Sequence, residues 1–241
     1  MNIKNSIRPL LSIIIPCFNE EKTIKKIIKK ILKIKDINKQ IIVVNDGSTD
    51  KSFDLIKKYK SKISLIINHK HNLGKGSCIK SAQKRVKGDI VLIQDADLEY
   101  DPKDYKKLID PILKKKFYVV YGSRVLNKNR FENLKNFTHW IRIVANSILT
   151  IISNIINKQS LTDAHTCYKV FNIEIFKRIR LNENDFSFCP EITTKISNLG
   201  YQIHEVPISY KGRAYSDGKK IKFRDGIKAI LTLIKYKFFC N

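Results

Sequence analysis

Residues 89–97 read DIVLIQDAD, an apolar run that ends in two closely spaced carboxylates. Similar short runs occur upstream as LSIII (11–15), QIIVV (40–44) and ISLII (63–67). Consecutive β-branched residues without polar alternation are typical of strands buried on both faces, as in a parallel sheet. The runs start between 23 and 29 residues apart, which leaves room for a helix to cross over between parallel strands. With a fifth strand expected at Tyr118–Tyr121, the sequence predicts an α/β fold in which helices flank a mostly parallel, Rossmann-like sheet.

The stretches between these runs have helical periodicity. In Glu21–Leu32, four isoleucines fall on one face and lysines on the other, which predicts an amphipathic helix. Further helices are expected at Asp50–Tyr59, at Gly74–Val86 and after Pro102. The less regular second half is expected to hold a long helix or broken pair at Phe131–Asn157, shorter helices at Val170–Arg180 and Pro190–Asn198, an edge strand at Tyr201–Tyr210, and a terminal helix at Ile221–Phe239 with lysines on its outer face. No linker separates the halves, so we expect a single domain over residues 1–241.

Composition narrows the class of protein. The 241 residues are 43% hydrophobic and 29% charged, which is ordinary for a globular chain and excludes intrinsic disorder. Five widely spaced cysteines form no C-x-x-C pair, so neither a disulfide framework nor a zinc site is expected. The longest apolar stretch, Ile141–Ile156, is interrupted by polar residues and is too short to span a bilayer. These features predict a cytoplasmic protein without a transmembrane helix.

The net charge is +25, from 47 basic and 22 acidic residues. The lysines are spread over many predicted helices, so most of them are expected on solvated helix faces. A binding role for the remainder would favour an anionic partner, namely lipid headgroups, a phosphorylated substrate or nucleic acid. A nucleic-acid-binding module therefore stays open as a lesser alternative, although acidic strand ends would repel a phosphate backbone.

Polar residues gather where the predicted strands end. In doubly wound sheets, ligands bind beyond the carboxyl ends of the strands. Here the segments after the strands are PCFNE (16–20), NDGSTD (45–50), NLGKG (72–76) and QDAD (94–97). None of these contains the glycine pattern of a dinucleotide site or a P-loop. Asp95 and Asp97 suit a hard divalent cation, Mg²⁺ or Mn²⁺, which commonly bridges to phosphate oxygens.

These strand-end segments resemble those of glycosyltransferase family 2. The resemblance continues downstream through YGSR (121–124), TDAHTCYK (162–169), PEI (190–192), EVPISY (205–210) and RAYSDGKKI (213–221). Together the motifs are similar to those of the dolichyl- and polyprenyl-phosphate mannosyl- or glucosyltransferase branch, over nearly the whole chain. The resemblance implies a GT-A-type fold and an inverting transfer. It also implies a nucleotide-sugar-binding part at about 11–125 and a more helical acceptor-binding part at about 126–241.

The resemblance implies roles for individual residues. The nucleotide sugar would bind at Pro16, Phe18, Glu20, Asp46, Gly74, Lys75, Asp95, Ala96, Asp97 and Glu99. Within that set, Asp46 would contact the base, and Asp95 with Asp97 would hold the metal. The catalytic group would comprise Asp97, Arg124, Asp163, Arg213 and Lys219, its cations facing the acceptor phosphate and the donor diphosphate. Asn45 stands where the family commonly has Asp, which leaves the choice between UDP and GDP open.

The chemistry favours one kind of acceptor. Displacing a nucleoside diphosphate from an anomeric carbon requires stabilisation of the leaving charge, which a divalent metal and cations supply. A polyprenyl or dolichyl phosphate is already ionised and needs no general base, whereas a saccharide or other hydroxyl acceptor needs one. Asp163 is the candidate base for that alternative. The sequence therefore predicts a metal-dependent hexosyltransferase moving glucose or mannose to polyprenyl phosphate, with a soluble acceptor as the alternative.

Several residues outside these sets are open to two interpretations. Ile141–Ile156, with Trp140 at its edge, would either pack on the sheet or lie in the plane of lipid headgroups, and the second arrangement would attach the protein peripherally at the cytoplasmic face. His69 and His71 are expected in a solvated loop. Glu191 is either a site acid or a helix-start acid. No nucleic-acid partner is expected.

Overall fold

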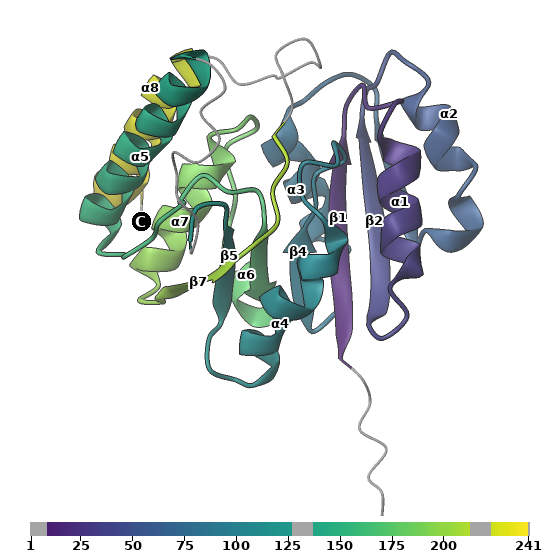
Figure 1. Cartoon of the computed structure of the whole chain (residues 1–241), viewed down its shortest axis with the longest axis horizontal. Helices are drawn as coiled ribbons and strands as arrows, with labels where there is room; N and C mark the ends of the chain where they lie inside the picture. Colours follow the sequence, from purple (N-terminus) through teal and green to yellow (C-terminus); the bar gives the residue numbers. More distant parts are fainter. Residues whose placement is uncertain (1–8, 127–136, 213–222, 241) are drawn as a thin grey trace, which may run out of the picture.

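The computed structural model describes residues 9–126, 137–212 and 223–240. Its seven-stranded sheet has the order β3-β2-β1-β4-β6-β5-β7 (Figure 1). The strands are β1 (Leu10–Cys17), β2 (Asn38–Asp46), β3 (Leu65–His69), β4 (Ile90–Ile93), β5 (Val119–Ser123), β6 (Lys169–Asn172) and β7 (Ile203–Pro207). Of these strands, only β6 runs antiparallel to its neighbours, so the predicted mostly parallel sheet is confirmed.

Helices cover both faces of the sheet. They are α1 (Ile24–Lys33), α2 (Ser52–Lys57), α3 (Lys75–Gln83), α4 (Tyr105–Leu113), α5 (Phe137–Asn157), α6 (Ile173–Arg178), α7 (Phe188–Asn198) and α8 (Phe223–Ile234), with short turns η1 (Lys60–Lys62) and η2 (Pro102–Asp104) and a final π-helical turn η4 (Lys235–Phe239). On one face, α1 and α4 bury their apolar side chains against the strands, and α3, α6 and α7 do so on the other. Neighbouring strand residues such as Ile13 and Ile14 enter opposite cores, which explains the uninterrupted apolar runs.

The region predicted as a helix at Val170–Arg180 was assigned wrongly at its start. Lys169–Asn172 forms β6, which lies between β4 and β5, and α6 begins only at Ile173. Four residues are too few to display a period, and the strand is defined by partners distant in sequence. The Tyr201–Tyr210 edge strand is confirmed, because β7 is the outer strand beside β5.

α5 and α8 form an outer layer at one end of the molecule. Both pack on α7 and on each other, and they lie side by side beyond it in Figure 1. The terminal helix was predicted to present lysines outward, but its exposed side chains also include Ile227, Leu231 and Phe238. None of the described helices combines the length and apolar character needed to cross a bilayer.

Candidate active site

Parallel pairing collects the predicted strand ends at one edge of the sheet. β1 pairs with both β2 and β4, so the segments after these three strands are neighbours. The last residues of β1 and β2 include Pro16 and Asp46, and Asp95 follows β4 by two residues. The switch in strand order beside β1 is where doubly wound folds bind ligands.

Gln94 anchors the turn that carries the paired carboxylates. It is fully buried, and its Oε1 accepts hydrogen bonds from the hydroxyls of Tyr105 at 2.8 Å and Tyr168 at 2.7 Å. Its Nε2 donates to the Asp95 carbonyl at 2.9 Å. Beyond the buried Ala96, Asp97 Oδ1 accepts from the Glu99 amide at 3.0 Å. Gln94 therefore links the backbone of the turn that carries the two carboxylates to buried tyrosines of the core.

Lys75 lies against the first of these carboxylates. Its ammonium forms an ion pair with Asp95 and is 3.0 Å from Cys167 Sγ. The rings of Phe186 and Phe188 are each 5.9 Å from the same nitrogen. Burial is the largest single influence and lowers the pKa of Lys75, but the charge and hydrogen bond of Asp95, together with the Cys167 and Cys189 thiols, hold this pKa well above its ordinary value. A protein cation thus neutralises Asp95 in this conformation.

The donor atoms at this turn fit a divalent metal. Asp95 and Asp97 offer only carboxylate oxygens, which Mg²⁺ and Mn²⁺ prefer, and such ions usually complete their coordination with phosphate oxygens and water. Elsewhere in the described part of the chain, Asp46, His69 and Cys78 are the one group of three potential ligands close enough to share an ion. That group is buried and mixed in donor type, so it does not suit a metal that must reach a diphosphate.

Asp46 is engaged by its own protein. It is 2% exposed, and its Oδ1 lies 2.6 Å from His69 Nδ1. The Leu73 and Gly74 amides donate to the same carboxylate at 3.0 and 2.8 Å. The placement of His69 in a solvated loop was wrong, because this residue ends β3 and its Nε2 is 2.9 Å from Ser81 Oγ. Asp46 shapes the loop before α3, and its contact with the nucleotide base stays a prediction.

The loop before α3 is locked by a segment from the second half of the chain. Gly74 has φ +95°, and a Cβ there would lie 2.5 Å from the Asn184 carbonyl. That carbonyl accepts a hydrogen bond from the Ser77 amide at 3.0 Å. Glu191, which is fully buried, holds the segment by accepting from the Asn182 and Glu183 amides at 2.6 and 2.9 Å. These contacts assign Glu191 a supporting role for the position of Lys75.

Arg124 and Asp163 form the second charged element of the site. Arg124 follows β5, and its Nε and Nη2 donate to the two Asp163 oxygens at 2.6 and 2.7 Å. The Arg124 amide and the Asn146 side chain also donate to Asp163. Burial would raise the pKa of Asp163, but the Arg124 guanidinium outweighs burial and lowers it to about 2. Asp163 is therefore a fixed anion that orients Arg124.

Glu205 supports this pair from β7, a role that sequence reasoning missed. Its carboxylate accepts from the Thr162 amide at 2.6 Å, the Thr162 hydroxyl at 2.8 Å and the Asp163 amide at 2.9 Å. The Arg124 guanidinium lies 5.2 Å from the centre of the Tyr210 ring, whose hydroxyl donates to Glu99 at 3.0 Å. Through Tyr210, Glu99 links the carboxylate turn to the cationic side of the site.

The remaining predicted residues divide into two groups. Phe18 and Glu20 follow β1, and the Glu20 amide donates to Ser52 Oγ at 2.7 Å while its carboxylate accepts from the Thr23 hydroxyl. These residues lie at the same sheet edge as Pro16. Arg213 and Lys219 lie outside the described residues.

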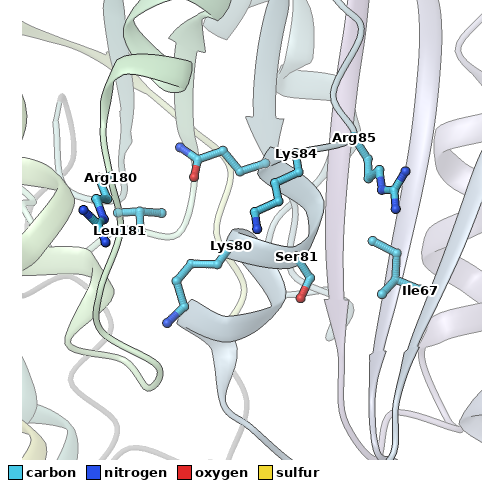
Figure 2. Close-up of a pocket in the computed structure, with 8 residues that line it drawn as sticks. Ile67, Lys80, Ser81, Lys84, Arg85, Arg180 and Leu181 are labelled. Carbon is cyan, nitrogen blue, oxygen red and sulfur yellow. The ribbon is translucent and has the colours of Figure 1, made fainter.

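A separate hollow lies along the second half of α3. Its volume is about 630 Å³, and its lining includes Lys80, Lys84, Arg85 and Arg180 (Figure 2). None of the predicted site residues lines it. Its cationic lining reflects the excess of lysine and arginine over the whole chain, and the candidate site remains the strand-end edge.

Known proteins share sequence and fold with this chain. The glycosyl transferase family 2 profile matches residues 12–180. A dolichyl-phosphate beta-glucosyltransferase from Trichomonas vaginalis is 30% identical over 95% of this chain and 73% of its own. A UDP-N-acetylglucosamine–dolichyl-phosphate N-acetylglucosaminyltransferase from Methanococcus voltae is 26% identical over 95% of this chain and 96% of its own. Glucosyl-3-phosphoglycerate synthase from Mycobacterium tuberculosis, crystallised with Mn²⁺ and UDP, superposes with a TM-score of 0.69 at 18% identity, covering 95% of this chain and 80% of its own.

The seven-stranded sheet and its flanking helices match the GT-A fold of that synthase. The chain belongs to glycosyl transferase family 2, because the family profile covers well over half of it. The resemblance to that family and the predicted fold class are confirmed.

Proposed function

We propose that this enzyme transfers a hexose from a UDP- or GDP-linked sugar to a polyprenyl or dolichyl phosphate, with inversion and with Mg²⁺ or Mn²⁺ as cofactor. The relatives from Trichomonas vaginalis and Methanococcus voltae are both named for dolichyl-phosphate acceptors, and both align with 95% of this chain. Their named sugars differ, so the donor sugar is a property for experiment to assign.

The ion pair between Arg124 and Asp163 is the observation that carries the choice of acceptor. A hydroxyl acceptor requires a base that can take its proton. Asp163, the candidate base, is fully buried, has a pKa lowered to about 2 and is bound through both oxygens to Arg124. A phosphate acceptor needs no base and gains instead from a fixed guanidinium, whose planar donors match phosphate oxygens.

The proposed reaction is a single displacement. An acceptor phosphate oxygen forms a bond to the anomeric carbon while the bond from that carbon to the donor diphosphate breaks, and the nucleoside diphosphate leaves with the electron pair. Arg124 orients the acceptor phosphate, and Lys75 balances charge beside the leaving group. Asp95 and Asp97 would hold the divalent cation, which stabilises the charge that develops on the diphosphate.

A lipid acceptor places the reaction at a membrane surface. We therefore retain peripheral attachment at the cytoplasmic face as part of the proposal. No transmembrane helix is required for it, since a lipid phosphate presents its headgroup at the interface.

Purified protein incubated with Mn²⁺ or Mg²⁺, polyprenyl phosphate and each labelled nucleotide sugar in turn tests the proposal. We expect butanol-extractable label that depends on the metal, with one donor preferred. Metal-dependent nucleotide binding without lipid label would overturn the acceptor assignment while keeping the glycosyltransferase class. Labelled lipid that still forms when all metal is chelated before the reaction starts would overturn the cofactor assignment.

A further inference from the structure

The outer faces of α5 and α8 carry an unusual surface. Large apolar side chains recur there at helical spacing, and all are exposed: Ile148, Ile151 and Ile155 on α5, and Ile227, Leu231, Ile234, Phe238 and Phe239 on α8 and η4. Ile155 is 74% exposed and Phe239 is 78% exposed. Isolated exposed apolar residues are ordinary, but a continuous set on two adjacent helices marks an interaction surface. We call these eight residues the apolar face.

The two helices present this face together. α5 and α8 both pack on α7 and on each other, so their sides turned away from α7 form one continuous exterior. Buried positions on α8 such as Ala229 and Leu233 alternate with the exposed ones in helical periodicity. The buried sides of the two helices already supply the apolar contacts that pack them on the domain. The exposed residues of the apolar face therefore take no part in this packing.

Charge at the edges of the apolar face identifies the partner. In the described part of α8 and η4, Arg224, Lys228, Lys235 and Lys237 alternate in sequence with residues of the apolar face, and Asp225 is the one acidic residue there. Lys158, directly after α5, is exposed as well. Lys228 and Lys235 reach sideways to Asp185 and Glu183, and both remain more than half exposed. Apolar residues flanked by lysines are the pattern of helices that lie in the headgroup region of a bilayer, where long basic side chains extend toward lipid phosphates. Interfaces between protein copies are instead depleted of lysine.

The position of the apolar face also suits a bilayer. Arg124 directly follows β5 and Tyr210 lies three residues after β7, and the Arg124 guanidinium is 5.2 Å from the centre of the Tyr210 ring. In Figure 1, the upper ends of both helices point to the same side of the molecule as the ends of β1 and β2 that lead into the site. A bilayer against the apolar face would therefore lie beside the edge where the acceptor phosphate is expected.

We propose that the apolar face is a docking surface for an anionic lipid bilayer, on which α5 and α8 lie parallel to the membrane plane. The choice of a bilayer rests in part on the proposed lipid acceptor, while the surface itself is independent of catalysis. α8 and η4 contribute most of the face, so docking is not confined to the α5 stretch that sequence alone singled out.

Flotation with vesicles that contain no polyprenyl phosphate tests the docking surface apart from the transfer reaction. Vesicles of phosphatidylcholine with phosphatidylglycerol are compared with pure phosphatidylcholine. We expect the wild-type protein to float with the anionic vesicles, and the double variant Ile151→Ser, Leu231→Ser to bind at least about tenfold more weakly because two apolar side chains lose their burial in lipid. The matched control is Leu113→Ser, Tyr118→Ser, which alters exposed apolar residues of α4 and the turn before β5 and should float like the wild type.

Three results would overturn the proposal. The first is absence of the wild-type protein from the floated fraction, and the second is equal flotation of the double variant and the wild type. The third is a stable homodimer in light scattering that the double variant converts to monomers, since the apolar face would then belong to a second copy of the chain. Thermal unfolding of each variant, expected within a few degrees of the wild type, separates lost docking from lost folding.

Discussion

The Nε atom of Arg124 donates to Asp163 Oδ2 at 2.6 Å, and its Nη2 donates to Oδ1 at 2.7 Å, so the two residues form a two-bond ion pair across 39 positions of sequence. Asp163 is fully buried, whereas a fifth of the Arg124 side chain is exposed. Asp163 therefore fixes Arg124 in place while part of the Arg124 side chain stays accessible to solvent. Asp163, the candidate base, is thus the counter-ion of Arg124, the cation that we propose binds the acceptor phosphate.

The substitution Asp163→Asn should destabilise the protein. It leaves Arg124 without its counter-charge, and breaking a buried pair in this way costs several kcal/mol. Because Arg124 is partly exposed, we expect a loss of about 2 kcal/mol in the free energy of unfolding at pH 7, measured by urea denaturation. An unfolding midpoint equal to the wild-type value would contradict the importance assigned to this pair.

The same pair predicts how stability depends on pH. The pKa of Asp163 is about 2 in the folded protein and near 3.9 in an unfolded chain. Its contribution is therefore fully present above about pH 5 and is lost as the pH falls through 4 toward 2. Urea denaturation of wild type and Asp163→Asn at pH 7, 5 and 3 should show a difference that is constant at the first two values and smaller at the third. A difference that grows on acidification would refute the sign of this shift.

Glu205→Gln should weaken the loop that carries Asp163. The carboxylate accepts three hydrogen bonds from Thr162 and Asp163, and bonds to a charged acceptor contribute more than neutral ones. We expect the free energy of unfolding to fall by about 2 kcal/mol. Glu174→Gln, at an exposed position on α6, is the matched control and should change it by less than about 0.5 kcal/mol.

The half of the site built on consecutive strands could be predicted from sequence. Apolar runs located the first five strands, and the rule for strand ends then placed Asp95 and Asp97 at the ligand-binding edge. Local patterns suffice there, because each carboxylate directly follows a recognisable strand. The resemblance to family 2 identified Arg124 and Asp163 as candidate site residues, but it did not predict the ion pair between them.

The features that could not be predicted from sequence arise from contacts between segments that are distant along the chain. β6 is four residues long and is held by β4 and β5 on either side, so no local period reveals it. The burial of His69 against Asp46 and Ser81 depends on β2, β3 and α3 coming together. Glu205 likewise gains its role only because β7 lies beside β5. The apolar side of α8 was visible as a pattern, but which side faces outward follows from its packing on α7.

Asp97→Asn should greatly weaken metal binding without unfolding the protein. Loss of one of two carboxylate ligands is expected to weaken Mn²⁺ affinity by at least about a hundredfold, measured as free Mn²⁺ by electron paramagnetic resonance in the presence of UDP or GDP. Asp110→Asn, on α4, is the control and should bind like the wild type. Unchanged Mn²⁺ affinity in Asp97→Asn would place the metal elsewhere.

Lys75→Met should separate metal binding from catalysis. The Lys75 ammonium neutralises Asp95, so a metal ion must compete with it. Without nucleotide, we expect Lys75→Met to bind Mn²⁺ about tenfold more tightly than wild type, because removal of a nearby like charge favours the cation. With substrates, its kcat/KM should fall, since the charge beside the leaving diphosphate is lost. Lys84→Met, at an exposed position directly after the same helix, should alter neither quantity. Weaker Mn²⁺ binding by Lys75→Met would contradict the proposed competition.

The most direct test of the proposed function compares polyprenyl phosphate with polyprenol of the same chain length, each offered with the preferred nucleotide sugar and metal. The two acceptors differ only in the ionised phosphate, for which we propose Arg124 as the binding cation. Asp163 is held by Arg124 through both carboxylate oxygens, so our proposal assigns it no role as a base. The account predicts labelled lipid from the phosphate alone, with a yield that falls at least about a hundredfold in Arg124→Met. Transfer to polyprenol, or to a soluble sugar hydroxyl at a comparable rate, would contradict it.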